Sequence, residues 1–115
     1  MSVRAAAVLA KAGRAHVPVF AALGDETRLA LVARLCERSP QSISQLTDGS
    51  RLTRQAISKH LAVLENAGIV ESVRAGRECH YELDPKPINE MKGYLDEVSR
   101  QWDEALGRLK AFVER

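Results

Sequence analysis

Aromatic residues and cysteines are scarce in this chain of 115 residues. Phe, Trp and Tyr together make up 4% of it, and its two cysteines are Cys36 and Cys79. A core poor in aromatics has to be built from Leu, Val, Ile and Ala, which suits packed helices. Two isolated cysteines exclude a disulfide framework and predict a reducing compartment, the cytoplasm.

Long apolar runs are missing too. An apolar run over residues 5–10 follows Arg4, but it is short, rich in Ala and interrupted by Lys11. An export signal needs a longer apolar region, and a membrane helix needs about 20 apolar residues. We therefore expect a cytoplasmic protein that makes no contact with a membrane.

The motifs that carry catalysis are also absent. The sequence has no Gly-rich phosphate loop, no nucleophile elbow and no spaced set of metal ligands. Cys79 and His80 are adjacent, but neighbouring strand residues point to opposite faces and make poor joint ligands. We predict a protein that is not an enzyme, with no metal site and no cofactor.

Positive charge is concentrated in one segment. The net charge is only +2, yet residues 49–64 contain no Asp or Glu and carry Arg51, Arg54 and Lys59. A length of 115 residues is enough for one core and too short for two. A local positive field on a single small domain is typical of a surface that contacts phosphates.

The first third of the chain favours helices. Residues 2–15 are predicted to form an Ala-rich helix or a loose arm, and residues 19–23 a short apolar segment. Asp25 is the expected N-cap of a helix that runs to about residue 38. Its predicted buried stripe is Leu31, Val32 and Leu35. We expect Cys36, beside this stripe, to be a small core residue.

A helix-turn-helix followed by a hairpin is predicted next. Ser42 and Gln45 have the capping-box spacing and open a short helix, and Thr53 is the N-cap of a second helix that ends near Gly68. Residues 69–74 are β-prone and residues 78–83 alternate between apolar and polar. The fold class is therefore mainly α with a β-hairpin wing, a winged helix-turn-helix.

The last segment has the strongest periodic pattern. Apolar residues recur at alternating steps of three and four, which is a heptad seam too long for so small a domain to bury. We predict a dimerisation helix; the alternative is a helix packed within one chain. Its predicted contacts are Met91, Leu95, Val98, Trp102, Leu109 and Phe112. The expected organisation is an arm or helix over residues 1–17, a DNA-binding domain over 18–85 and this helix over 86–115.

The second helix of the pair is the predicted recognition helix. At about 100° per residue, its Ile, Leu and Leu at positions 57, 61 and 64 face the core, and its polar residues face away. The alternative is an ordinary solvated helix face. The predicted base readers are Gln55, which suits adenine, Lys59, which suits guanine, and Ser58, which can bond either of these bases. The predicted phosphate contacts are Arg51, Thr53 and Arg54.

Three more residues are predicted at the DNA. His60 lies partly inward on the helical wheel, so a packed or backbone-bonded side chain competes with a phosphate contact. Arg74 and Arg77 flank Gly76 at the wing tip. An arginine there can enter the minor groove, and the alternative is a tip kept soluble by its charge.

Four segments together are similar to one family. Residues 20–28, Phe-Ala-Ala-Leu-Gly-Asp-Glu-Thr-Arg, resemble the opening of the arsenical-resistance-type repressors, the ArsR family. Residues 55–64 resemble their recognition helix, residues 67–70 its exit, and residues 76–83 their wing. The resemblance implies four helices, two strands and a final helix in a homodimeric repressor. It also implies an inverted repeat on double-stranded DNA, with half-sites about one helical turn apart.

The resemblance stops at the metal sites. Where the better-known members have Cys-x-Cys, residues 42–45 read Ser-Ile-Ser-Gln, and no histidine follows His80 to ligate from the last helix. The chain is most similar to the metal-free group, whose last helix carries a Trp, here Trp102. The resemblance therefore implies a regulator whose inducer is an unknown small molecule, or one that has no inducer.

Two other functions stay open at this point. A thiol-based redox-sensing repressor would use Cys36 and Cys79 if the fold brings them together. A winged helix can also serve as a protein-interaction module. The lack of Asp and Glu in residues 49–64 argues against that module, because a protein-only surface has no reason to exclude them.

Overall fold

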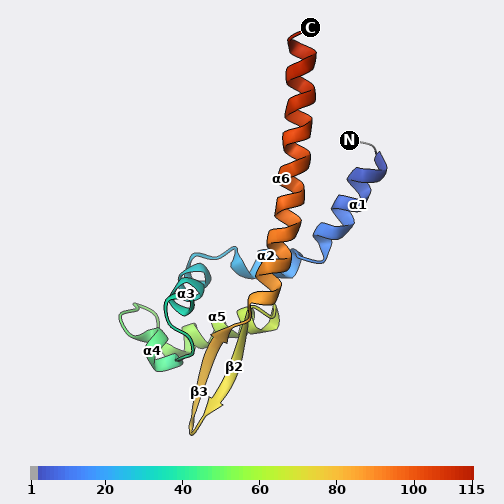
Figure 1. Cartoon of the computed structure of the whole chain (residues 1–115). Coiled ribbons are helices and arrows are strands. Elements are labelled where there is room, and N and C mark those ends of the chain that lie inside the picture. Colours follow the sequence, from blue (N-terminus) through green and yellow to red (C-terminus); the bar gives the residue numbers. More distant parts are fainter. Residues whose placement is uncertain (1–2) are drawn as a thin grey trace.

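The computed structural model describes residues 3–115 and shows one long helix projecting from a small winged body (Figure 1). The elements in order are α1 (Val3–Arg14), α2 (Val17–Leu23), α3 (Glu26–Glu37), β1 (Gln41–Ser42), α4 (Ile43–Thr47), α5 (Arg54–Asn66), β2 (Val70–Ala75), β3 (Glu78–Leu83) and α6 (Pro85–Val113). The molecule measures 67 × 25 × 20 Å because α6 stands away from the body. The mainly helical fold with a hairpin wing is confirmed.

Short polar side chains cap the starts of three helices, α3, α4 and α5. Asp25 Oδ1 accepts a hydrogen bond of 3.0 Å from the backbone N–H of Arg28. Ser42 and Gln45 form the reciprocal capping box at 3.1 and 2.8 Å, and Thr53 accepts from the N–H of Ala56 at 3.1 Å. All three predicted helix starts are confirmed, since each side chain satisfies a backbone donor that the helix leaves unpaired.

The core lies where α3, α4 and α5 meet the base of the wing. Its fully buried side chains are Leu35, Leu46, Ile57, Leu61, Leu64, Ile69 and Val70. Val32 is only half-buried, and the prediction that Cys36 is a core residue is wrong, because Cys36 is exposed. Position 36 follows the innermost residue of α3, Leu35, by about 100° of helix rotation, which turns the thiol toward solvent.

The sheet contains one strand more than the predicted hairpin. Its order is β1-β3-β2, all antiparallel, with Gln41 opposite Tyr81 and Ser42 opposite His80. A two-residue strand shows no periodicity in the sequence, so only the tertiary pairing reveals it. Gln41 is buried and donates from Nε2 to the carbonyls of Arg34 and Arg38, which closes the carboxyl end of α3.

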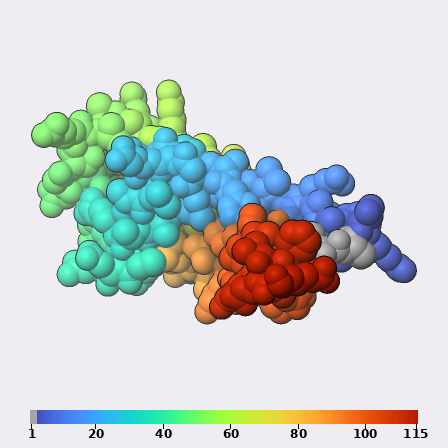
Figure 2. Space-filling model, turned by 90° about the horizontal axis from the view of Figure 1, so that it is seen from above, coloured from blue at the N-terminus to red at the C-terminus, as the bar shows by residue number. Residues whose placement is uncertain are grey.

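The amino-terminal segment is a helix rather than a loose arm over its described part, and α1 runs next to α6. The two helices contact each other along the inner half of α6, where Gly13 of α1 meets Tyr94, and Figure 1 shows them diverging from there. Figure 2 shows the helix-turn-helix at the opposite end of the molecule from α1. A side chain at Gly13 would clash with Tyr94, since its Cβ would lie 2.6 Å from the hydroxyl oxygen. Gly13 therefore permits the close approach of the two helices.

Within residues 3–115, no single helix has both the length and the apolar composition to cross a membrane. The helices α1 and α2 meet that test only when taken together, and they are bent by 56° at the break between them.

Candidate nucleic-acid interface

The recognition helix presents two distinct faces. Ile57, Leu61 and Leu64 are buried to 1% exposure or less, and they anchor α5 on the core. The predicted base readers Gln55, Ser58 and Lys59 are all exposed on the other side. The arrangement leaves α5 anchored by its core side while its polar side is free to enter a major groove, which is wide enough for a helix.

Positive charge at the start of α5 is uncompensated. Arg51 and Arg54 are exposed, as is Lys59 one turn further on, and no ion pair of theirs is found within residues 3–115. The unpaired N–H groups at the helix start add a positive partial charge at the same place. Thr53 is exposed, and its Oγ1 caps the helix. The combination creates a local field that attracts an anionic backbone.

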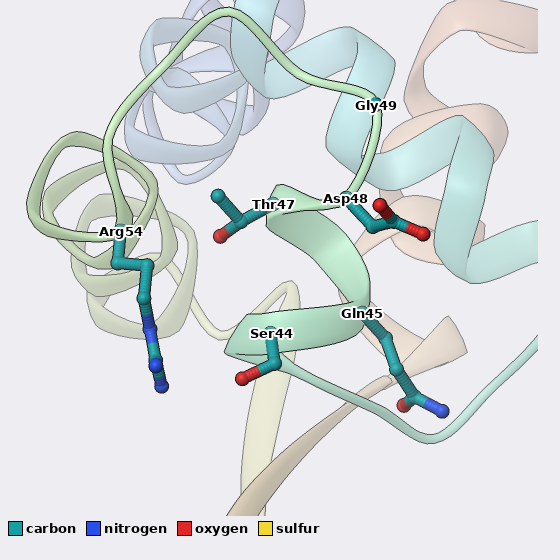
Figure 3. A pocket seen from close by; sticks show the side chains of 6 residues that line it. All are labelled: Ser44, Gln45, Thr47, Asp48, Gly49 and Arg54. Carbon is teal, nitrogen blue, oxygen red and sulfur yellow. The ribbon is translucent and has the colours of Figure 1, made fainter.

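A surface depression of about 460 Å³ lies between α4 and the start of α5 (Figure 3). Ser44 and Thr47 point from α4 toward the side of Arg54, whereas Gln45 and Asp48 point the other way. Thr47 donates to the carbonyl of Ile43, so its hydroxyl hydrogen is already used. Ser44 was not among the predicted residues, because only the packing of α4 beside α5 brings its exposed side chain near Arg54.

His60 is held by a residue from another helix. Its Nδ1 lies 3.3 Å from Nη1 of Arg28 and 3.9 Å from Oδ1 of Asp25, and its side chain is 26% exposed. Arg28 also donates from Nε to the carbonyl of Ala22 at 2.5 Å and from Nη2 to that of Ala21 at 3.4 Å. Arg28 therefore links the end of α2, the start of α3 and the recognition helix.

The same contacts act on the carboxyl group of Asp25. The backbone N–H of Arg28 is the main cause that lowers the pKa of Asp25, and partial burial opposes it. The charge of Arg28 lowers the pKa further, as does that of His60 when its ring is protonated. Asp25 is therefore held as a carboxylate at the junction of three helices. An arginine has no acceptor atom, so Nδ1 of His60 accepts in this contact and the ring hydrogen is assigned to Nε2.

The wing carries its two arginines in the open. Arg74 on β2 and Arg77 in the turn are exposed, and Gly76 between them has a φ of +65°, a conformation that favours glycine. On β3, burial is the main cause that raises the pKa of Tyr81, with smaller effects from Cys79 and Glu65. The hairpin is thus anchored at its base and charged at its tip.

The two thiols are not joined in a disulfide. Cys36 is exposed on α3 and Cys79 is half-buried on β3, and both are free. For the described part of the chain, no three His, Cys, Asp or Glu side chains are grouped to hold a metal ion.

The predicted seam on α6 divides into two parts. Met91 is half-buried and packs against this chain's own core, together with Ile88. Val98 is half-buried near α1, whereas Leu95 and Trp102 are 44% and 63% exposed. Toward the end of α6, Leu109 and Phe112 are even less covered than Leu95. The outer half of α6 therefore has an apolar surface that this chain leaves open to solvent.

Comparison with known proteins adds independent findings. Residues 25–72 match the family model described as "Bacterial regulatory protein, arsR family". The chain is 41% identical to an uncharacterized HTH-type transcriptional regulator, YuzN, of Bacillus subtilis, over 68% of this chain and 92% of that protein. It is 29% identical to the arsenical resistance operon repressor of the same organism, over 66% of this chain and 72% of the repressor.

A solved structure shows the same architecture. An ArsR-like transcriptional regulator from Rhodococcus sp. RHA1 superposes with a TM-score of 0.76 and 38% identity, over 86% of this chain and 92% of that one. The similarity extends beyond residues 25–72, which carry the family pattern.

Proposed function

This chain belongs to the ArsR family of bacterial regulatory proteins, and from that premise we propose that it is a homodimeric repressor that reads an inverted repeat on double-stranded DNA. Membership makes it a DNA-binding transcriptional regulator with a winged helix-turn-helix, and not an enzyme. The observation that carries the proposal is the exposed polar face of α5 above a fully buried apolar face. Acting on DNA, it works in the cytoplasm.

Base reading is assigned to the first turns of α5. In this proposal Gln55 pairs with an adenine, Lys59 donates to a guanine, and Ser58 bonds either base. All three are exposed on the side away from the core. Each bidentate pair is worth about 1–3 kcal/mol of discrimination against a wrong base, so these residues account for a large share of specificity.

Phosphate contacts are assigned around this helix. Arg54 and Ser44 border the depression between α4 and α5, where a phosphate can accept from the guanidinium and the hydroxyl. Arg51 and Thr53 flank the same site. His60 contributes through Nε2, since its Nδ1 is occupied by Arg28. These contacts set the position of α5 on the duplex but read no sequence.

The wing arginines are assigned to the neighbouring minor groove. Arg74 and Arg77 are exposed at the tip of the β2–β3 hairpin, beyond the residues of β3 that pair with β1. A narrow minor groove has a strongly negative potential, which attracts arginine side chains.

Dimerisation is assigned to the outer half of α6. Leu95, Trp102, Leu109 and Phe112 expose a large apolar surface on one projecting helix, and such a surface marks an interface. A second copy is the partner we propose, because two-fold dimers are the commonest assemblies and they present two recognition helices to an inverted repeat. The half-sites then lie about 34–36 Å apart on one face of the duplex.

Regulation by a metal is not part of the proposal. Residues 42–45 provide no thiolate, and among residues 3–115 no three His, Cys, Asp or Glu side chains are clustered to hold a metal ion. If repression is relieved by an inducer, we propose that this inducer is a small organic molecule.

Selection of binding sites from random duplex DNA, with the purified protein at moderate salt, tests the proposal. The expected result is an inverted repeat with turn-like spacing. A parallel selection with the double variant Gln55→Ala, Lys59→Ala is the matched control and should recover no such repeat. If the wild type recovers no sequence, or binds DNA only in a salt-sensitive way without sequence preference, a protein-interaction module is favoured instead.

A further inference from the structure

Arg34 on α3 reaches across to the first helix of the helix-turn-helix. Its Nη1 donates to the carbonyls of Leu46 and Asp48 at 2.5 and 3.3 Å, and its Nη2 donates to that of Gln45 at 2.7 Å. A helix as short as α4 leaves the carbonyls at its carboxyl end without partners of its own. One planar guanidinium, with its donors in a fixed fork, therefore closes the end of α4.

The segment that precedes α4 is tied to the same residue. Gln41 is buried, and its Nε2 donates to the backbone carbonyl of Arg34 at 2.9 Å. Arg34 thus contacts the chain on both sides of α4, through its backbone before the helix and through its side chain after it. Between these ties, α4 is held by the buried Leu46. A buried side chain fixes the depth of a helix, whereas ties at both ends also fix its rotation.

The rotation of α4 decides which groups face Arg54. At the depression of about 460 Å³, Ser44 points to the side of Arg54, whereas the carboxylate of Asp48 points away from it (Figure 3). A turned α4 would withdraw the hydroxyl of Ser44 and bring this carboxylate toward the position of a phosphate. The hydroxyl can donate to a phosphate, but a carboxylate repels one.

We propose that Arg34 is a positioning residue for a DNA phosphate bound between Ser44 and Arg54. Its guanidinium is occupied by three carbonyls, so it acts by holding α4 and not by contacting the DNA. The inference rests on the proposed function, because the phosphate contact is part of that function. It adds a residue of α3 to the set that determines the affinity for DNA.

The affinity of Arg34→Met for a labelled duplex of random sequence tests this role, because phosphate contacts carry no sequence information. Fluorescence anisotropy at moderate salt should give a dissociation constant at least about fivefold above that of the wild type, as expected for the loss of one hydrogen bond to a charged group. Arg38→Met is the matched control, because it removes the same charge from the exposed C-cap of α3. It should stay within about twofold of the wild type, since salt screens an exposed charge.

A double-mutant cycle with Ser44→Ala separates positioning from a general loss of stability. Ser44→Ala alone should weaken binding of the duplex at least about fivefold. If Arg34 acts through Ser44, the double variant should bind no more than about twofold more weakly than the weaker single variant. Effects that multiply would overturn the proposal, as would an unchanged affinity of either single variant.

Arg34→Lys keeps the proposal testable if urea unfolding shows that Arg34→Met does not fold. Lysine retains the charge, but its single nitrogen cannot span three carbonyls. The variant should fold and bind the duplex at least about threefold more weakly than the wild type. Wild-type affinity in Arg34→Lys would contradict the role of the fork and overturn the proposal.

The wild type itself separates this inference from the proposed function. A wild type that does not bind the duplex even at low salt would refute the proposed function, and this inference with it. A wild type that binds, with Arg34→Met no weaker than Arg38→Met, keeps the regulatory role and loses only the role of Arg34.

Discussion

Replacing Arg28 by Met removes the side chain that joins α2, α3 and α5. Arg28 is buried to 17% side-chain exposure and donates to the carbonyls of Ala21 and Ala22 and to Nδ1 of His60. Met retains an unbranched apolar stem of similar length, so the packing around the stem is largely kept. The variant therefore tests the polar contacts and not the volume of the side chain.

The largest loss comes from the carbonyl of Ala22. Ala22 is 2% exposed, so its oxygen loses a charged donor at 2.5 Å and gains little from water. A hydrogen bond to a charged group is worth about 1.5–3 kcal/mol, and the 3.8 Å ion pair with Asp25 adds up to about 1 kcal/mol. We expect the free energy of unfolding to fall by about 2–4 kcal/mol, a large part of the 5–15 kcal/mol typical of a domain.

Urea unfolding at one fixed protein concentration measures this loss, since the stability of a dimer depends on concentration. The midpoint should fall by about 1–2 M with an unchanged slope. Arg38→Met is the matched control, because Arg38 is exposed, and it should stay within about 0.5 kcal/mol of the wild type. An effect of Arg28→Met no larger than that of the control would refute the assignment of Arg28 as the link between the three helices.

Three other predictions follow from the interface and the long helix. The double variant Gln55→Ala, Lys59→Ala should lose its preference for the selected site while its unfolding curve and dimer mass stay unchanged; retained discrimination would mean that another face of α5 enters the groove. Trp102→Asp should break the dimer, measured by sedimentation, and weaken operator binding strongly, and a stable, fully active variant would contradict the seam. Arg100 and then Gln101 lower the pKa of Glu97 from 4.5 to about 2, so its contribution to stability is present above pH 4.5 and is lost as the pH falls toward 2. Glu97→Gln should flatten that loss, and an unchanged acid profile would show that the contact with Arg100 has no effect on stability.

Local chemistry accounts for the parts that could be predicted in advance. Asp25, Ser42 and Thr53 each cap a helix by bonding a backbone N–H within three residues, so their roles are visible in short stretches of sequence. The orientation of α5 follows in the same way, because helical periodicity alone separates its apolar face from its polar face.

Short or irregular features were harder to predict. The strand β1 has two residues and no pattern, and it exists because β3 pairs with it. Cys36 lies beside an apolar stripe in sequence, but the angle at which α3 packs leaves it exposed. Ser44 lies near Arg54 only because α4 packs beside α5, and this proximity is not visible in the local sequence.

The sequence by itself determined the helix starts, the outward face of the recognition helix, the wing and an unpaired apolar stripe on the last helix. Each of these depends on residues a few positions apart, where backbone geometry is the same in any fold. The contact of Arg28 with His60 spans 32 positions, and those of Arg34 with the end of α4 span 11 to 14. Only the tertiary structure decided these, because contacts between distant segments depend on how whole helices pack and not on local periodicity.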